Sequence, residues 1–440
     1  MSLQECIDYT LANNLQVKNK ELEYHSSKAK VGEFLSLGYP QISGNVDFAY
    51  NYIIPTTFIQ DFVSPAVYGV LFTENVIPSK PLPPAEFFPV QFGTKYTGRM
   101  TLDFTQMVFD GSFFVGLKAS QTYTELSRKD LIKSKTDAVT AIKKAYYSVM
   151  VNKERLALVE KNLGRLDSLL RDTKSMYENG FVEKIDVNRI QVQFNNIKVA
   201  LQNAAFGLKV SMDLLKFQMG MSIEEKLDVS DDLNTLKFQV LADDFKEGFE
   251  YEDRIEYSVL MTNHDLVGID IKNTKVQYMP KIDLYGNYGG SYGTSGFNNL
   301  FAFGENWFEL GTLGVRMSIP IFDGMQKSYM IKQKKFKLEQ VENSMELLKN
   351  QIDMEKEQAS STFNTSLENL RAQQENMALA EEVYRVTKIK YEQGVGANIE
   401  VIDADASYKE AQTNYYSALY DALIATVDME KAYGKLGITE

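Results

Sequence analysis

Four short stretches of this chain alternate apolar and polar residues, and the long stretches between them repeat apolar residues at helical spacing. Residues 41–52 alternate throughout, with one face formed by Ile42, Val46, Phe48, Tyr50 and Tyr52 and the other by Gln41, Ser43, Asn45, Asp47 and Asn51. A period of two is typical of a strand with one buried face. The same pattern predicts strands over 98–108, 281–292 and 308–320, and a phase slip at Gly311-Thr312 predicts a β-bulge in the last of them.

Between the strands, apolar residues recur every three or four positions, which predicts amphipathic helices. Pro40 ends the first helix, and the predicted set is 3–38, 111–177, 183–219, 253–279, 324–391 and 397–436. The two longest would each extend roughly 100 Å at 1.5 Å per residue. In each half of the chain the shorter helices together hold about as many residues as the long one. Stacked end to end, they would therefore pair with it along its length as a coiled-coil layer.

The order of these elements repeats along the chain. Tyr177-Glu178-Asn179-Gly180 returns 214 positions later as Tyr391-Glu392-Gln393-Gly394, and Phe109-Asp110-Gly111 returns 213 positions later as Phe322-Asp323-Gly324. Such self-similarity predicts a tandem duplication. We assign the first repeat to residues 1–219 and the second to 253–440, and we expect the short acidic segment 220–252 to be a small mixed insertion.

Two strands in each repeat give the chain four, which are too few to close a barrel. An open sheet would expose amphipathic edges, so closure requires further copies: two copies would give eight strands and three would give twelve. The fold class is therefore α+β, with a sheet completed by other chains and a coiled-coil helical part. Tyrosines lie toward the loop-side ends of the first strand of each repeat, where a membrane barrel carries an aromatic girdle: Tyr50, Tyr52, Tyr288 and Tyr292.

Residues 53–97 hold seven of the ten prolines, placed among Phe, Val and Ile. Proline at that density is incompatible with a central strand or a helix interior, so a long loop is predicted. A shorter loop rich in Gly, Asn and Phe is predicted over 293–307. The long loop is expected to be extracellular, either as a lid that narrows the barrel mouth or as a flap against the next protomer. Its many Phe residues favour burial or contact with lipid head groups over a mobile arm.

Composition narrows the possible function classes. A net charge of −12 argues against a nucleic-acid partner. No run of 18 apolar residues predicts a transmembrane helix, and the N-terminus lacks signal-peptide features, so we expect any secretion signal to have been removed. Cys6 is the only cysteine, and His25 and His264 are far apart in sequence. We therefore expect no internal disulfide, no metal site, no cofactor and no catalytic set.

In element order and in motifs, the chain resembles the TolC-type outer-membrane efflux proteins. The resemblance covers nearly the whole chain and rests, besides the two Tyr-x-x-Gly turns, on Ser2-Leu3-Gln4-Glu5-Cys6-Ile7, Ala12-Asn13-Asn14, Pro40, Pro280 and Asp253-Arg254-Ile255-Glu256. It implies a homotrimer in the outer membrane of a Gram-negative bacterium. Twelve strands would form the transmembrane β-barrel, twelve helical columns would form an α-barrel in the periplasm, and residues 220–252 would belong to the equatorial region.

The resemblance also implies roles for acids near the second turn. Glu400 and Asp403 lie three residues apart on one helical face and match the constriction ring of the family. Without the resemblance, both acids are equally well explained as N-terminal helix residues favoured by the helix dipole. Asp186 matches an acid in the hydrogen bonds that hold the entrance shut, and Tyr391 matches the turn tyrosine.

The turns themselves are predicted at Gly180, Gly394 and Gly396. Gly396 is a departure, because some family members have an arginine there that ties neighbouring helices together. Lys184 and Arg189 are candidates to replace that link.

We therefore predict a passive exit duct, gated at the helical tip, that receives small molecules or polypeptides from an inner-membrane pump and a periplasmic adaptor protein. Outer-membrane lipid would surround its barrel. The rival hypothesis is a soluble coiled-coil scaffold without channel activity, which the strict strand alternation capped by tyrosines disfavours. An enzyme is the least favoured class.

Overall fold

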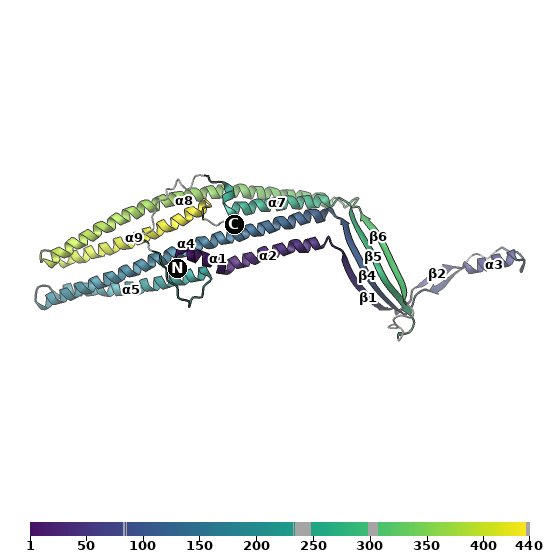
Figure 1. Cartoon of the computed structure of the whole chain (residues 1–440), viewed down its shortest axis with the longest axis horizontal. Helices are drawn as coiled ribbons and strands as arrows, with labels where there is room; N and C mark the ends of the chain where they lie inside the picture. Colours follow the sequence, from purple (N-terminus) through teal and green to yellow (C-terminus); the bar gives the residue numbers. More distant parts are fainter. Residues whose placement is uncertain (82–83, 85, 232, 234–247, 298–306, 437–440) are drawn as a thin grey trace. The chain divides into compact units, whose positions relative to one another are not determined.

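The computed structural model describes residues 1–440 except 82–83, 85, 232, 234–247, 298–306 and 437–440 (Figure 1). The chain forms two compact units. A helical unit comprises Met1–Val31, Lys118–Lys272 and Ser328–Glu440, and a sheet unit comprises Gly32–Leu117 and Asn273–Lys327. Each unit thus draws on both halves of the sequence.

The sheet unit is built on four antiparallel strands in the order β1-β4-β5-β6, which lie side by side in Figure 1. Their bounds are Gln41–Tyr50 for β1, Tyr96–Phe109 for β4, Lys281–Thr294 for β5 and Phe308–Ser318 for β6. The junction between the two halves of the chain is the pairing of β4 with β5, which extends over both strands from Tyr96↔Thr294 to Phe109↔Ile282.

Residues paired directly across antiparallel strands point to the same face. The register therefore gathers most of the apolar side chains of the four strands on one face: Ile42, Val46, Phe48, Tyr50, Tyr96, Met100, Leu102, Phe104, Ile282, Leu284, Tyr288, Tyr292, Leu313, Val315 and Met317. The other face carries most of the polar and charged side chains, including Asp47, Arg99, Asp103, Asp283 and Arg316. Ile42 and Leu313 on the apolar face are 72% and 77% exposed, so the chain leaves this face uncovered.

The predicted bulge at Gly311-Thr312 is wrong. Strand β6 pairs with β5 in one unbroken register from Phe308 to Ser318. The phase slip arises because Phe308 and Leu310, near the loop end, lie on the otherwise polar face. The register shift in this sheet occurs instead between Met107 and Phe109 of β4.

The predicted loop 53–97 is not irregular throughout, because it contains two strands and one helix. Strands β2 (Thr56–Gln60) and β3 (Phe87–Gln91) pair as a two-stranded ribbon, and helix α3 (Val63–Thr73) lies between them in sequence. The prolines fit because Pro65 is in the first turn of α3 and Pro89 lies on a strand with one unpaired edge. The predicted loop 293–307 lies largely outside the described residues.

The helical unit contains two long hairpins, which Figure 1 shows as α4 with α5 and α8 with α9. Their bounds are Gly111–Glu178 for α4, Lys184–Met219 for α5, Gln326–Glu392 for α8 and Asn398–Ala432 for α9. Shorter helices are α1 (Leu3–Asn13), α2 (Leu15–Ser36) and α7 (Ile255–Val276). Within the described residues, no helix is both long and apolar enough to cross a bilayer.

One continuous helix over 3–38 was predicted, but the chain breaks it at Asn14. This residue has an extended backbone, with φ −61° and ψ 125°. Its side-chain oxygen accepts hydrogen bonds from the backbone N–H groups of Gln16 and Val17, at 2.9 and 3.2 Å. Asparagine commonly caps helices in this way, so Asn14 ends α1 and starts α2.

The predicted insertion 220–252 is described only in part, and Asp243 and Asp244 lie outside the described residues. Its first acidic stretch contacts the start of the chain: the Asp231 carboxylate accepts hydrogen bonds from Leu3 N at 2.9 Å and from the Tyr146 hydroxyl at 2.8 Å. Tyr146 lies in the main core of the helical unit with Cys6 and Met219. The segment thus seals one side of that core.

Candidate functional site

The two hairpin turns have the same backbone hydrogen bonds. In the first, Gly180 N donates to Tyr177 O at 3.0 Å and Phe181 N donates to Met176 O at 2.9 Å. In the second, Gly394 N donates to Tyr391 O at 2.9 Å and Val395 N donates to Lys390 O at 3.0 Å. Gly180 and Gly394 have φ values of +78° and +72°, a left-handed conformation that favours glycine. Both predicted turn glycines therefore sit where the helix must reverse.

Gly396 has a different role in the second turn. A Cβ atom at this position would lie 3.1 Å from Tyr391 N and 3.2 Å from Lys390 Cβ. The departing chain therefore packs closely against the end of α8. A larger residue at this position would require the turn to open.

A compact apolar cluster lies behind the turns and takes side chains from all four hairpin helices: Leu166, Leu169, Leu170, Ile190, Ile197, Tyr384, Tyr391, Val401, Ala404 and Tyr408. Tyr391 is 7% exposed, and its hydroxyl makes no hydrogen bond of ordinary geometry. Burial raises the pKa of Tyr391, the Thr173 hydroxyl opposes this rise, and the nearby Asp186 carboxylate adds to it. Tyr391 thus joins the hairpins mainly by packing.

The predicted acids divide into two groups. Glu400 and Asp403 are exposed side chains on the first turns of α9, where they are open to water. Asp186 is turned back on its own helix: its carboxylate accepts a hydrogen bond from Glu183 N at 3.4 Å and lies 3.6 Å from Arg189. Arg189 is therefore engaged within its own helix. The structure brings Asp186 near Tyr391, whereas Glu400 and Asp403 face away from the cluster that holds Tyr391.

Sequence reasoning missed a buried polar cluster farther from the turns. Arg165 of α4 lies 3.4 Å from Asp405 of α9, and Asp405 also pairs with Lys409. Arg165 donates a hydrogen bond of 2.7 Å to Asn162, which in turn donates one of 3.0 Å to Gln412. The cluster therefore links the two hairpins through polar contacts beside the apolar cluster behind the turns.

Two stacked tyrosines complete this cluster. The guanidinium carbon of Arg165 lies 4.7 Å from the ring centre of Tyr384 and 5.1 Å from that of Tyr408, and the two ring centres are 6.1 Å apart. Cation–π contacts of this kind favour a partly desolvated arginine. Burial raises the pKa of Tyr384, which the positive charge of Arg165 opposes. The signal available in the sequence was the spacing of Asp405 and Lys409, one helical turn apart.

The chain also matches known proteins. The family model described as "Outer membrane efflux protein" matches residues 263–435. The outer membrane protein TolC of Vibrio cholerae is 21% identical over 339 residues, which cover 76% of this chain and 76% of that protein. The alkaline protease secretion protein AprF of Pseudomonas aeruginosa is 20% identical over 332 residues, covering 74% of this chain and 67% of that protein.

Solved structures share the fold. The Campylobacter jejuni CmeC outer membrane channel has a TM-score of 0.75 at 14% identity and covers 98% of this chain and 85% of its own. The Neisseria gonorrhoeae MtrE outer membrane channel, solved in an open state, has a TM-score of 0.72 at 15% identity. This match covers 98% of the present chain and 88% of the MtrE chain. The chain is similar to outer membrane efflux proteins in its sequence and in its fold.

These similarities confirm the resemblance inferred from the sequence, and they support the expected outer-membrane location and the expected class of efflux or secretion duct. The soluble scaffold is not favoured. The family is one of transport ducts rather than enzymes.

The tyrosines predicted to form an aromatic girdle occupy different positions in the four-stranded sheet. Tyr50 pairs with Tyr96 at the loop end, with ring centres 5.0 Å apart, and Tyr52 follows the strand and is fully exposed. Tyr292 is buried and stacked on Trp307 at 6.0 Å. Tyr288 is not at the strand end as predicted, because β5 continues for six more residues. Tyr96 and Trp307 were not predicted and extend the aromatic set.

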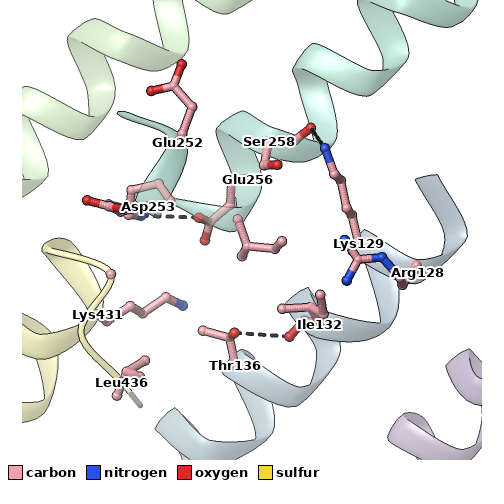
Figure 2. Close-up of a pocket in the computed structure, with 13 residues that line it drawn as sticks. Arg128, Lys129, Ile132, Thr136, Glu252, Asp253, Glu256, Ser258, Lys431 and Leu436 are labelled. Atoms are coloured by element: carbon pink, nitrogen blue, oxygen red, sulfur yellow. Dashed lines mark hydrogen bonds and ion pairs between the residues drawn. The ribbon is translucent and has the colours of Figure 1, made fainter. Parts of the chain in front are cut away.

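A polar pocket of about 240 Å³ lies where α4, α9 and the start of α7 meet (Figure 2). Figure 2 shows Lys129 extending toward Ser258 and Lys431 pointing into the space between the helices. Lys129 donates to Ser258 O at 3.3 Å and to the Thr262 hydroxyl at 2.8 Å, and Lys431 pairs with Asp137 at 3.0 Å. These lining cations are already engaged within the chain, so the pocket is a structural junction.

Beside this pocket, Arg254 is 5% exposed and holds the start of the second repeat in place. Its guanidinium lies 3.2 Å from Glu256 and 2.9 Å from Glu355, and it donates to Ala432 O at 3.2 Å. Burial alone would lower the pKa of Arg254, but the two carboxylates hold it above its ordinary value. The motif Asp253-Arg254-Ile255-Glu256 therefore acts as an anchor among α7, α8 and α9.

His264 lies 3.6 Å from Glu342 and 3.7 Å from Asp265. Among the described residues, no group of three or more His, Cys, Asp or Glu side chains is arranged to hold a metal ion.

Proposed function

We propose that three copies of this chain assemble into a passive channel in the outer membrane, with the four-stranded sheets forming one twelve-stranded barrel. The observation that carries this proposal is the sheet itself. Its apolar face is uncovered, its other face is polar, and β1 and β6 each have one edge without a partner strand among the described residues. Pairing β1 of one copy with β6 of the next would satisfy both edges.

A barrel that closes within the lipid bilayer would also explain why one face of the sheet is apolar and the other polar. A membrane barrel places apolar side chains against the hydrocarbon and polar side chains toward a water-filled lumen. The proposed number of copies follows from the width that the lumen of a duct requires. An eight-stranded barrel is just wide enough for its own side chains to fill it, so two copies would leave no duct, whereas twelve strands enclose a wider interior.

The aromatic residues at the loop end fit this orientation. Tyr50, Tyr52 and Tyr292, together with Tyr96 and Trp307, would lie at the outer water interface, where aromatic rings concentrate in membrane barrels. Tyr288, in the middle of the apolar face, would lie against acyl chains.

The helical hairpins would form the periplasmic tunnel, and their tips would form its entrance. The two halves of the chain, which share the same turn hydrogen bonds, would act as tandem repeats. Six such hairpins around one axis would bring Glu400 and Asp403 of three copies together as a ring of six carboxylates. Asp186 and Tyr391, held near each other behind the turns, would set how closely the hairpins approach. Opening would be a movement of the tips driven by a periplasmic adaptor, with energy supplied by an inner-membrane pump.

Molecular mass and conductance test this proposal together. The detergent-solubilised protein should have the mass of three copies by light scattering, and the same fraction should produce discrete ion currents in planar bilayers. Omission of detergent should cause aggregation, because the apolar face of the sheet would lose its cover. A monodisperse water-soluble monomer would overturn the proposal, as would the mass of two copies.

A further inference from the structure

Helix α3 is apolar on every side. The twelve residues from Phe62 to Thr73, between Asp61 and Glu74, include no charged side chain. At 100° per residue, Val63, Val67 and Val70 lie along one face, and Tyr68 and Phe72 lie on the opposite face with ring centres 6.1 Å apart. No residue of α3 is buried, and Val67 and Val70 are 51% and 62% exposed.

A helix that is apolar all round requires apolar surroundings on all sides. A groove on a protein partner would cover one stripe and leave the opposite face in water. Acyl chains of a lipid leaflet can cover both faces at once. The eleven residues of α3 extend about 16 Å, roughly half of a hydrocarbon core of about 30 Å, so this helix fits within one leaflet and cannot cross two.

The arm that carries α3 starts at the aromatic end of the sheet. Beyond the last β1–β4 pair, Tyr50↔Tyr96, Asn51 N donates to Lys95 O at 2.8 Å and the Asn51 side chain donates to Thr94 O at 2.9 Å. These bonds bind the two legs of the arm to each other where they leave the sheet (Figure 1). Exposed rings also line the ribbon and the segments beside it: Phe58, Phe87, Phe88 and Phe92. The apolar surface of the sheet thus continues into the arm.

Polar groups mark both ends of the helix. The Asp61 carboxylate accepts hydrogen bonds from Val63 N at 3.0 Å and from Ser64 N at 2.8 Å, and Glu74 and Asn75 follow the last turn. Such ends are suited to the head-group region, with the apolar body between them in the acyl chains.

Resting on the outer-membrane channel proposed above, we infer that α3 inserts into the outer leaflet beside the sheet and anchors the arm that carries it to the lipid. The alternative of a lid over the channel mouth would place an uncharged helix in the water of the exit path. This inference goes beyond the channel function and does not depend on the number of copies.

Fluorescence quenching from within the lipid tests the inference on the full-length protein. Cys6 is the only cysteine and is fully buried, so Cys6→Ser gives a cysteine-free background. Val70→Cys and Phe72→Cys, on opposite faces of α3, are each labelled with an environment-sensitive nitrobenzoxadiazole dye and reconstituted into vesicles. Lipids brominated on their acyl chains should quench both positions, and aqueous iodide should quench neither. Ser168→Cys, an exposed site in the helical unit, is the matched control and should respond only to iodide.

Quenching of both α3 positions by iodide would overturn the inference in favour of an arm in water. Quenching of only one face by bromine, or disulfide cross-linking of Val70→Cys between copies, would overturn it in favour of a protein groove or a second copy. Bilayer conductance of the same labelled samples is recorded in parallel. A conducting sample whose arm stays in water refutes the anchor alone, whereas a sample without currents counts against the proposed channel.

Discussion

Arg165 of α4 and Asp405 of α9 lie 3.4 Å apart although 240 positions separate them in sequence. Asp405 is 4% exposed, and the Arg165 guanidinium is held against two tyrosine rings. Together with the hydrogen bond from Asn162 to Gln412, this pair joins the first hairpin to the second behind the tip through polar contacts.

We predict that Asp405→Ala lowers stability by about 3 kcal/mol, because it leaves a largely desolvated guanidinium without its charge partner. The double variant Arg165→Met with Asp405→Ala should lose less stability than the sum of the losses in the two single variants, since it no longer leaves the guanidinium without its carboxylate. Thermal unfolding followed by circular dichroism in detergent measures both. Arg385→Met is the matched control: its partner Glu382 is exposed on α8, and the melting temperature should not change measurably. Strict additivity of the two single losses would show that the pair is not coupled.

A second prediction concerns the proposed ring of acids. Glu400→Gln with Asp403→Asn removes charge and keeps the side-chain shape. Because rings of carboxylates favour cations in a pore, the variant should show weaker cation preference and altered single-channel conductance in planar bilayers. Glu410→Gln, which removes an exposed acid farther along α9, should leave both quantities unchanged. Equal effects from all three positions would mean that general surface charge, rather than a ring, sets selectivity.

A third prediction concerns the turn glycines. Gly394→Ala should lower stability by about 1 kcal/mol because an L-residue is strained at a φ of +72°. Gly394→Asn should lower stability by less than Gly394→Ala does, since asparagine tolerates this backbone conformation. Gly164→Ala is the contrasting control: Gly164 lies inside α4, and a Cβ there would meet nothing within 4 Å. That substitution should raise the melting temperature, because alanine favours helix over glycine by about 1 kcal/mol. Stabilisation by both alanines would exclude strain at the turn.

The main helices and strands could be predicted from the sequence because each follows a regular hydrophobic pattern over many residues. The alternation in 41–52 is visible since one face of β1 is apolar throughout, and the helices around the Gly180 and Gly394 turns extend over many heptads. Predictions from the hydrophobic pattern were wrong where individual side chains depart from the period of their helix or strand. Phe308 and Leu310 lie on the polar face of β6, and Asn14 breaks a helix through one side chain.

Other features could not be read from one sequence for a different physical reason. Arg165, Tyr384 and Asp405 come from three helices, and only the packing of those helices makes their contact. Helix α3 was not predicted because the prolines around it indicated a loop, although Pro65 lies in the first turn of the helix, where proline is tolerated. The candidate gate residues were placed through family resemblance, and their chemistry in the assembled ring depends on contacts between copies.

The last prediction concerns pH and the Arg254 anchor. Burial raises the pKa of Glu256, but the nearby Arg254 guanidinium outweighs this and holds the pKa below its ordinary value of 4.5, with Lys431 contributing. A lowered folded-state pKa gives stability that is complete above the unfolded value and is lost as the pH falls through the folded value. Wild type should therefore melt at a higher temperature than Glu256→Gln at about pH 7, and the two should converge as the pH falls below about 4.5. Glu252→Gln, an exposed neighbour, should match wild type throughout. A gap between wild type and Glu256→Gln that stays constant with pH would assign the loss to packing rather than to the charge pair.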